Sequence, residues 1–241
     1  MIELYHCVNA RSFRPLWTLE ELGAPYQLHM LPFPPRALQR SYLELNPLGT
    51  IPLLVDGDTR MTESAAICQY LAQRCDPDNR RGLAVLPDQP GYGAWLNFLH
   101  HGEATLTFPQ TIVLRYGRFE PDERKLPQAA DDYAKWFIAR LRGIDTVLQQ
   151  HAFVAADRFT VADVSVGYAL MLAHELDLVP RFPPAVAAYS ERLQQRDGFR
   201  RALAAQRDAA VAQGISPSTS TGPACATPGR SEDARPQCVA L

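Results

Sequence analysis

The chain has 241 residues, of which 46% are hydrophobic and 21% are charged, and its formal net charge is −2. A chain of this length and composition can bury a large core and fold into one or two globular domains. The balanced charge gives no electrostatic case for nucleic acid as a partner. No apolar run approaches the roughly 18 residues of a membrane span and no signal peptide opens the chain, so we expect no membrane association.

The cysteines are scattered, and no two of them have the C-x-x-C spacing of a dithiol or zinc site. An odd, scattered set in a chain without a secretion signal predicts free thiols in a reducing compartment, so we expect a cytoplasmic protein and no metal. The five cysteines are Cys7, Cys68, Cys75, Cys225 and Cys238.

The first 45 residues alternate between strand and helix patterns. Residues 2–6 and 26–31 have the pattern of short strands. Between them, Ser12 is suited to begin a helix whose apolar stripe ends at Gly23. This strand–helix–strand order predicts two parallel strands joined by a right-handed crossover. Residues 36–45 are expected to form one further short helix.

Residues 46–71 carry the densest pattern of the chain. Their sequence, NPLGTIPLLVDGDTRMTESAAICQYL, predicts a turn, a strand at 51–55, a D-G hairpin, a second strand and a helix that begins at Thr62. Pro52 is unusual inside an apolar strand because it removes a ladder donor, although a cis bond makes it tolerable. We expect the N–H and C=O of Ile51 to be free for an extended, peptide-like ligand.

The helix start that follows is suited to an anion. Unpaired N–H groups at a helix N-terminus, together with the Ser64 hydroxyl, can hold a carboxylate. The order N-P-x-G-x-[IV]-P followed by E-S-x-A-I-x-x-Y-L, here at residues 46–52 and 63–71, resembles the glutathione-binding half of the glutathione transferases. The resemblance extends over residues 1–212 and is weaker in the second half.

The resemblance implies an α+β fold of two domains, an N-terminal thioredoxin-like βαβαββα domain followed by an all-α helical domain. We expect the first domain at residues 1–76, a linker at 77–89 and the helical domain at 90–212. Residues 213–241 are predicted to be disordered, because their composition cannot bury enough apolar surface. The last four residues, 238–241, match a C-a-a-X motif, but the acidic residues before them argue against prenylation.

The second half of the chain has helical periodicity throughout. Phe137, Leu141 and Ile144 recur on one apolar stripe. Thr160 and Asp163 have the spacing of a capping box at a helix start, so Asp163 is interpreted as a folding signal rather than a catalytic acid.

The resemblance implies that Ser12 is the catalytic residue. In the serine-type members of the family the matching serine donates its hydroxyl to the glutathione sulfur, which favours the thiolate, and Arg11 or Arg14 would add positive charge. Three alternatives stay open. Ser12 can be a plain helix cap, Tyr5 can be the donor instead, and Cys7 can act as a redox cysteine.

Glutathione itself is expected on the backbone of Ile51 and Pro52, with Glu63 and Ser64 at its γ-glutamyl end. Arg36 either lies near its glycyl carboxylate, as in some relatives, or is a solvated arginine at a helix start. The pocket for the second substrate has no diagnostic spacing. Its candidates are Tyr5, Phe13, His101, Phe108, Arg115 and Tyr116.

The sequence therefore predicts a glutathione S-transferase that conjugates the glutathione thiolate to a small apolar electrophile. Glutathione is expected as a co-substrate, with no tightly bound cofactor. The resemblance further implies a two-fold homodimer. Two other functions stay open: a glutathione-dependent peroxidase or thiol transferase on the same scaffold, and a non-catalytic binding protein, since a fold does not fix a function.

Overall fold

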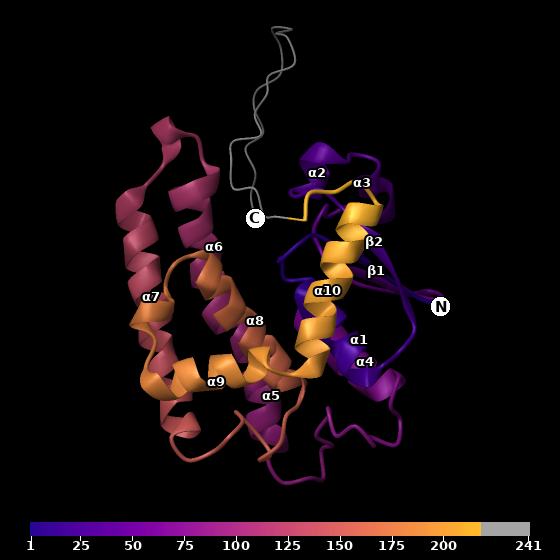
Figure 1. The fold of residues 1–241 in the computed structure, drawn as a ribbon, viewed down its shortest axis with the longest axis vertical. Helices are drawn as coiled ribbons and strands as arrows, with labels where there is room; N and C mark the ends of the chain where they lie inside the picture. The colour runs from indigo at the N-terminus through magenta and orange to yellow at the C-terminus, as the bar shows by residue number, and fades with distance from the viewer. Residues whose placement is uncertain (218–241) are drawn as a thin grey trace, which may run out of the picture.

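A four-stranded sheet with its helices lies beside a bundle of longer helices in the computed structural model, which describes residues 1–217 (Figure 1). The C-a-a-X end and residues 218–241 of the predicted disordered tail lie outside the described residues. The strands are β1 (Ile2–His6), β2 (Tyr26–Met30), β3 (Leu53–Asp56) and β4 (Thr59–Met61). The α-helices are α1 (Phe13–Leu22), α2 (Pro35–Leu38), α3 (Tyr42–Leu45), α4 (Ser64–Arg74), α5 (Tyr92–His100), α6 (Phe108–Leu114), α7 (Pro127–Leu148), α8 (Val161–Glu175), α9 (Pro184–Gln194) and α10 (Asp197–Ala212). Two π-helical segments, η1 (His101–Thr107) and η2 (Arg115–Phe119), and two 3₁₀ turns, η3 (Asp122–Arg124) and η4 (Val179–Arg181), complete the set.

The sheet has the strand order β2-β1-β3-β4. Strands β1 and β2 are parallel, with Leu4 opposite Leu28, and α1 forms the crossover between them. Strands β3 and β4 are antiparallel neighbours joined by the Gly57 hairpin. Helix α1 ends at Gly23, whose φ of 64° is the left-handed conformation that closes a helix. These elements confirm the predicted order of the first part of the chain.

The main core joins the sheet to α1 and α4. Leu4 and Leu54 of the sheet are fully buried in one cluster with Leu16 of α1 and Ile67 of α4. A smaller cluster that includes Tyr42 and Ile51 lies under the α2–α3 segment. Buried aliphatic side chains at these spacings account for the sheet-to-helix packing.

The single helix predicted over 36–45 is wrong in detail. The chain forms two separate turns, α2 and α3, and leaves the helical conformation at Gln39, whose φ is −140°. Each turn has four residues, so neither has the length at which local hydrogen bonds alone stabilise a helix.

The helical half is built around α8, whose residues 161–173 are all buried. The capping box predicted at its start is confirmed. Asp163 Oδ2 accepts the Thr160 N–H at 2.8 Å, and Thr160 Oγ1 accepts the Ala162 N–H at 3.2 Å. The stripe of Phe137, Leu141 and Ile144 on α7 is fully buried, as its spacing predicts.

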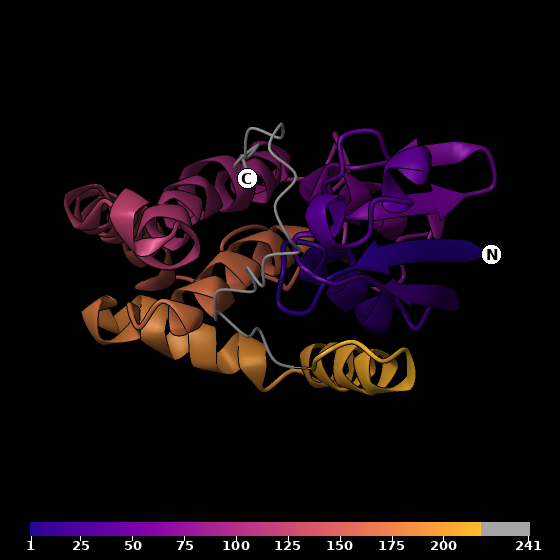
Figure 2. The same cartoon turned by 90° about the horizontal axis from the view of Figure 1, so that it is seen from above.

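The last helix, α10, returns to the first part of the chain and packs against α1 and β2 (Figures 1 and 2). Gln213, just beyond it, accepts the Met30 N–H through its side-chain oxygen at 2.8 Å. The observed architecture confirms the predicted fold class. The domain boundaries stay predictions. Within residues 1–217, no helix is both long enough and apolar enough to span a bilayer.

Candidate functional site

The Ile51–Pro52 peptide bond is cis, and β3 begins only after it, at Leu53. Pro52 therefore lies before the strand and removes no ladder donor from it. The expectation that both backbone groups of Ile51 are free is wrong for the carbonyl. Its oxygen accepts a hydrogen bond from Nε of Arg11 at 2.7 Å.

Helix α4 begins at Ser64, two residues later than predicted, and Glu63 takes the extended position before it. The first backbone bond of the helix runs from the Ile67 N–H to the Glu63 carbonyl at 2.9 Å. The side chain of Ser64 points inward, to the helical half. Its hydroxyl is fully buried and donates to Glu103 Oε2 at 2.6 Å. The carboxylate expected from a ligand at this hydroxyl is therefore supplied here by the helical half of the protein.

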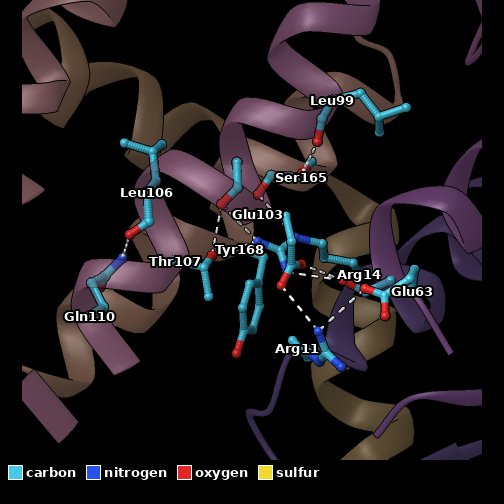
Figure 3. Close-up of polar contacts among 12 residues, drawn as sticks. Arg11, Arg14, Glu63, Leu99, Glu103, Leu106, Thr107, Gln110, Ser165 and Tyr168 are labelled. Carbon is cyan, nitrogen blue, oxygen red and sulfur yellow. Dashed lines mark hydrogen bonds and ion pairs between the residues drawn. The ribbon is translucent and has the colours of Figure 1, made fainter. Parts of the chain in front are cut away.

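A fully buried arginine holds the same carboxylate from the other side (Figure 3). Arg14 Nη1 contacts Glu103 Oε2 at 2.5 Å and donates to Ser64 Oγ at 3.2 Å. Its guanidinium carbon also lies 4.3 Å from the centroid of the Tyr168 ring, a cation–π contact. Buried charge is tolerated here because each N–H has a partner.

Glu103 thus lies between two arginines. Arg11 Nη1 reaches Glu103 Oε1 at 3.3 Å and Glu63 Oε2 at 3.6 Å. Burial alone would raise the pKa of Glu103, but Arg14, the Ser64 hydroxyl and Arg11 together lower it, so the carboxyl is ionised at neutral pH. We call Arg11, Arg14, Glu63, Ser64 and Glu103 the charged cluster.

The π-helical segment η1 is what carries Glu103 into this position. A wider turn leaves carbonyls without their usual partners in the helix. Side chains from other elements supply them: Ser165 donates to the Leu99 carbonyl at 2.6 Å, and Arg14 donates to that of Gly102 at 3.0 Å (Figure 3). Gly102 is required by packing as well, because a Cβ there would lie 2.4 Å from the Ser165 oxygen.

Ser12 occupies the N-cap position of α1, but its hydroxyl makes no capping bond. It is fully buried, lies 2.7 Å from His6 Nδ1 and accepts the Cys7 N–H at 3.3 Å. The other ring nitrogen of His6 lies 3.0 Å from Gln206 Oε1 on α10.

The neighbouring hydrogen bonds determine which atoms donate between Ser12, His6 and Gln206. The Asn9 backbone N–H donates to Gln206 Oε1 at 3.1 Å, so that oxygen is an acceptor. We therefore assign the His6 proton to Nε2, which leaves Nδ1 to accept the proton of the Ser12 hydroxyl. Burial lowers the pKa of His6 to about 4, so the ring is neutral. The one proton of Ser12 thus points at His6.

Arg36 lies in α2, against the turn that precedes Ile51. A Cβ on Gly49 of that turn would lie only 2.6 Å from the Arg36 Cβ, and Gly49 has a φ of 61°. Both observations explain why a glycine is needed at this position. Arg36 is therefore near the expected ligand backbone but makes no part of the charged cluster.

The residues predicted for the second-substrate pocket are not brought together. Phe13 is fully buried in the core, with its ring 5.4 Å from that of Phe199. Tyr5 lies on the sheet, stacked on His29 at 4.6 Å. Burial, followed by the charge of Glu3, raises the pKa of Tyr5.

The remaining four lie on the helical half. His101 and Phe108 line a hollow of about 430 Å³ with Trp136, and no member of the charged cluster lines it. Arg115 is paired with Glu120 at 3.0 Å and lies over the Tyr116 ring at 5.4 Å. In the described part of the chain, no group of three or more His, Cys, Asp or Glu side chains is arranged to hold a metal.

Sequence reasoning missed Glu103 altogether and gave Arg11 and Arg14 only an auxiliary role. A signal for Glu103 exists, because it is the only acidic residue between Gly91 and Phe119. A lone carboxylate on an otherwise uncharged inner helix face needs a cationic partner from elsewhere. No local pattern indicates which cation that is.

Comparison with known proteins shows the family. Residues 10–74 match the family described as the glutathione S-transferase N-terminal domain. Glutathione S-transferase 3 of Zea mays is 30% identical over 176 residues, which cover 69% of this chain and 76% of that protein. Glutathione S-transferase 3 of Schizosaccharomyces pombe is 34% identical over 98 residues, 41% of this chain and 40% of that relative's length.

A solved structure extends the likeness over both halves. The glutathione transferase URE2P6 from Phanerochaete chrysosporium, in complex with oxidized glutathione, has a TM-score of 0.74 at 25% identity. The alignment covers 85% of this chain and 95% of that one. With its thioredoxin-like first part and helical second part, this chain belongs to the glutathione S-transferase family.

Proposed function

We propose that this protein binds glutathione and conjugates its thiolate to a small apolar electrophile. The observation that carries the proposal is the meeting of three features at one place: the backbone edge at Ile51, the start of α4 at Ser64 and the charged cluster. The residue Arg11 links them, since it contacts both the Ile51 carbonyl and Glu103.

The charges of the cluster suit the γ-glutamyl end of glutathione, which carries one ammonium and one carboxylate. Glu63 is 66% exposed and can accept from the ammonium, while the N–H groups at the start of α4 can donate to the carboxylate. Backbone pairing at Ile51 suits the central cysteinyl residue, because an extended peptide can pair with a strand-like edge. Arg36 is proposed near the glycyl carboxylate.

Retention on immobilised glutathione, followed by a screen of aryl halides, epoxides and hydroperoxides, tests this function. We expect retention and turnover with an aryl halide. A protein that is not retained and turns over none of these would contradict it, and retention without turnover would favour the non-catalytic binding protein.

The role of Ser12 stays a prediction. Since its hydroxyl is buried and its proton points at His6, direct donation to sulfur requires that bond to break. The geometry favours a role in holding the loop between β1 and α1. A bound-thiol pKa that rises in Ser12→Ala by a unit or more, about 1.4 kcal/mol, would support direct donation instead.

The thiol transferase alternative would use Cys7, and no observation favours it. Cys7 is fully buried, and burial raises the pKa of its thiol to about 12, so the nucleophilic thiolate is scarce at neutral pH. Cys7, Cys68 and Cys75 are free thiols, which supports a cytoplasmic location that cell fractionation can test.

We also propose a homodimer. Phe108 and Trp136 are 51% and 40% exposed beside the hollow that His101 lines, on the face formed by η1, α6 and α7. Large exposed apolar side chains around a hollow are typical of association surfaces. Light scattering should report twice the chain mass of 26.8 kDa, and Trp136→Glu should shift it toward the monomer. A wild-type protein of one chain mass at micromolar concentration would contradict this.

A further inference from the structure

Arg11 stands where the proposed ligand must bind. Its Nε donates to the Ile51 carbonyl at 2.7 Å, a well-formed bond in the free protein. The cysteinyl N–H of glutathione, paired along this edge, would need the same oxygen. Either Arg11 leaves that oxygen when glutathione binds, or the ligand lacks that bond.

The side chain of Arg11 is free enough to change its contacts, unlike that of Arg14. Arg14 is fully buried, and its guanidinium is engaged by Ser64, Glu103, Thr107 and backbone carbonyls. The Arg11 side chain is 27% exposed, and its contacts to Glu103 and Glu63 are longer, at 3.3 and 3.6 Å. Arg11 is therefore the cation of the charged cluster that a ligand can reach and move.

The charge of the cluster also changes when a thiolate arrives. The two arginines balance Glu63 and Glu103, so the free cluster is neutral. A glutathione thiolate would add one negative charge within reach of Arg11, since the cysteinyl residue is proposed above to pair with Ile51. A guanidinium beside a thiolate lowers the thiol pKa, since opposite charge favours the ionised form.

Resting on the function proposed above, we propose that Arg11 is a catalytic residue. In the free protein it donates a hydrogen bond to the Ile51 carbonyl. When glutathione pairs with Ile51, the cysteinyl N–H displaces Arg11, and the guanidinium turns to the sulfur and stabilises it as the thiolate. The thiol proton leaves to solvent, and the guanidinium pairs with the thiolate that remains.

This assignment explains two features that Ser12 alone does not. The Ser12 hydroxyl is bonded to His6, whereas the guanidinium of Arg11 has five N–H donors and its side chain is 27% exposed. Arg11 also comes from the loop directly before α1, so it approaches the site from the same side as the helix N-terminus.

The test uses two ligands, glutathione and S-methylglutathione, which has no ionisable thiol. In Arg11→Met, we expect the pKa of bound glutathione, followed by thiolate absorbance across pH, to rise by about one unit. The affinity for S-methylglutathione should stay equal or become a few-fold tighter, because the Ile51 carbonyl is released. Arg11→Lys should recover most of the lowered thiol pKa, since it keeps the charge.

The control is Arg207→Met, which removes one positive charge from the exposed outer face of α10, where Arg207 pairs with Asp208. It should leave the thiol pKa and both affinities unchanged. Thermal unfolding of each variant checks that it is folded. If Arg11→Met does not fold, Arg11→Lys serves as the second variant.

Two results would overturn the proposal. A thiol pKa in Arg11→Met equal to that of the wild type would remove Arg11 from thiol activation. A loss of S-methylglutathione affinity of tenfold or more would mean that Arg11 anchors the ligand rather than yielding to it. A wild type that binds neither ligand would instead overturn the proposed function itself, and this inference with it.

Discussion

Helices α8 and α1 each have a hydroxyl side chain at the N-cap position, and the two hydroxyls bond to different partners. At the start of α8, Thr160 accepts an N–H of the first turn and Asp163 reaches back to the Thr160 N–H. At the start of α1, the Ser12 hydroxyl makes no capping bond and joins His6. One helix start is closed by its own residues, and the other is held by β1 and α10.

The cause of this difference is in the sequence. Three residues after Thr160 is Asp163, which completes a capping box. Three residues after Ser12 is Pro15, which has no backbone N–H to donate. At the N2 position the Arg14 N–H donates to the Arg11 carbonyl at 3.2 Å, so neither N2 nor N3 offers an N–H to the Ser12 hydroxyl. That hydroxyl bonds to His6 and accepts the Cys7 N–H instead.

The largest effect on the free energy of unfolding is expected at the start of α8. Asp163 is fully buried and accepts four bonds, from Thr160 N–H and hydroxyl, the Val154 N–H at 3.0 Å and the Tyr189 hydroxyl at 2.7 Å. Asp163→Ala leaves these donors without a partner, so the free energy of unfolding should fall by about 4 kcal/mol. Chemical denaturation measures this.

A smaller loss, below about 1 kcal/mol, would mean that the helix start is held by packing instead. Since Asp163 lies outside the charged cluster, glutathione affinity of the folded fraction should not change. A change in that affinity would contradict the structural reading of Asp163.

The second prediction concerns the other helix start and pH. Burial lowers the pKa of His6 to about 4, below its unfolded value of about 6.5. As pH falls below 6.5, the unfolded chain binds a proton that the folded protein does not, so stability is lost. Relative to His6→Asn, the wild type should lose about 2 kcal/mol between pH 7 and pH 5.

Asp163 titrates in the opposite direction, because burial raises its pKa to about 6, so the folded state gains stability as pH falls through that value. It is present in both proteins, and the difference between them isolates His6. A difference that stays constant from pH 7 to pH 5 would show that His6 is accessible to protons in the folded state.

The smallest effects compare the two hydroxyls directly. Thr160→Ala and Ser12→Ala should each lower the free energy of unfolding by about 1 kcal/mol, for one lost cap and one lost buried hydrogen bond. Only Ser12→Ala should also slow turnover, because it loosens the loop that carries Arg11. Equal turnover in the two variants would remove Ser12 from the site.

The same contrast separates what the sequence could predict from what it could not. The crossover of β1, α1 and β2, the Gly23 helix end and the capping box all follow from residues near one another in the chain. The inward bond from Ser64 to Glu103 spans 39 residues. The Arg11 bond to Ile51 spans 40 residues. Such partners depend on the assembled fold, and no local pattern specifies them.

The π-helical segment η1 is a second feature that the sequence does not predict. The predicted helix after Tyr92 is present, but its period widens at η1, where side chains from α1 and α8 satisfy the freed carbonyls. Periodicity detects the helix and cannot detect the bulge, because the compensating donors, Arg14 and Ser165, lie outside the segment. That bulge places Glu103 in the site.

The position of the glutathione site can be measured by titrating isotopically labelled protein with glutathione and following its backbone amide resonances. We expect the largest shifts at Ile51, Glu63 and Ser64, together with a shift at Arg11, whose side chain leaves the Ile51 carbonyl. Largest shifts at His101 and Phe108, which line the hollow outside the charged cluster, would contradict this expectation, as would the absence of any saturable shift.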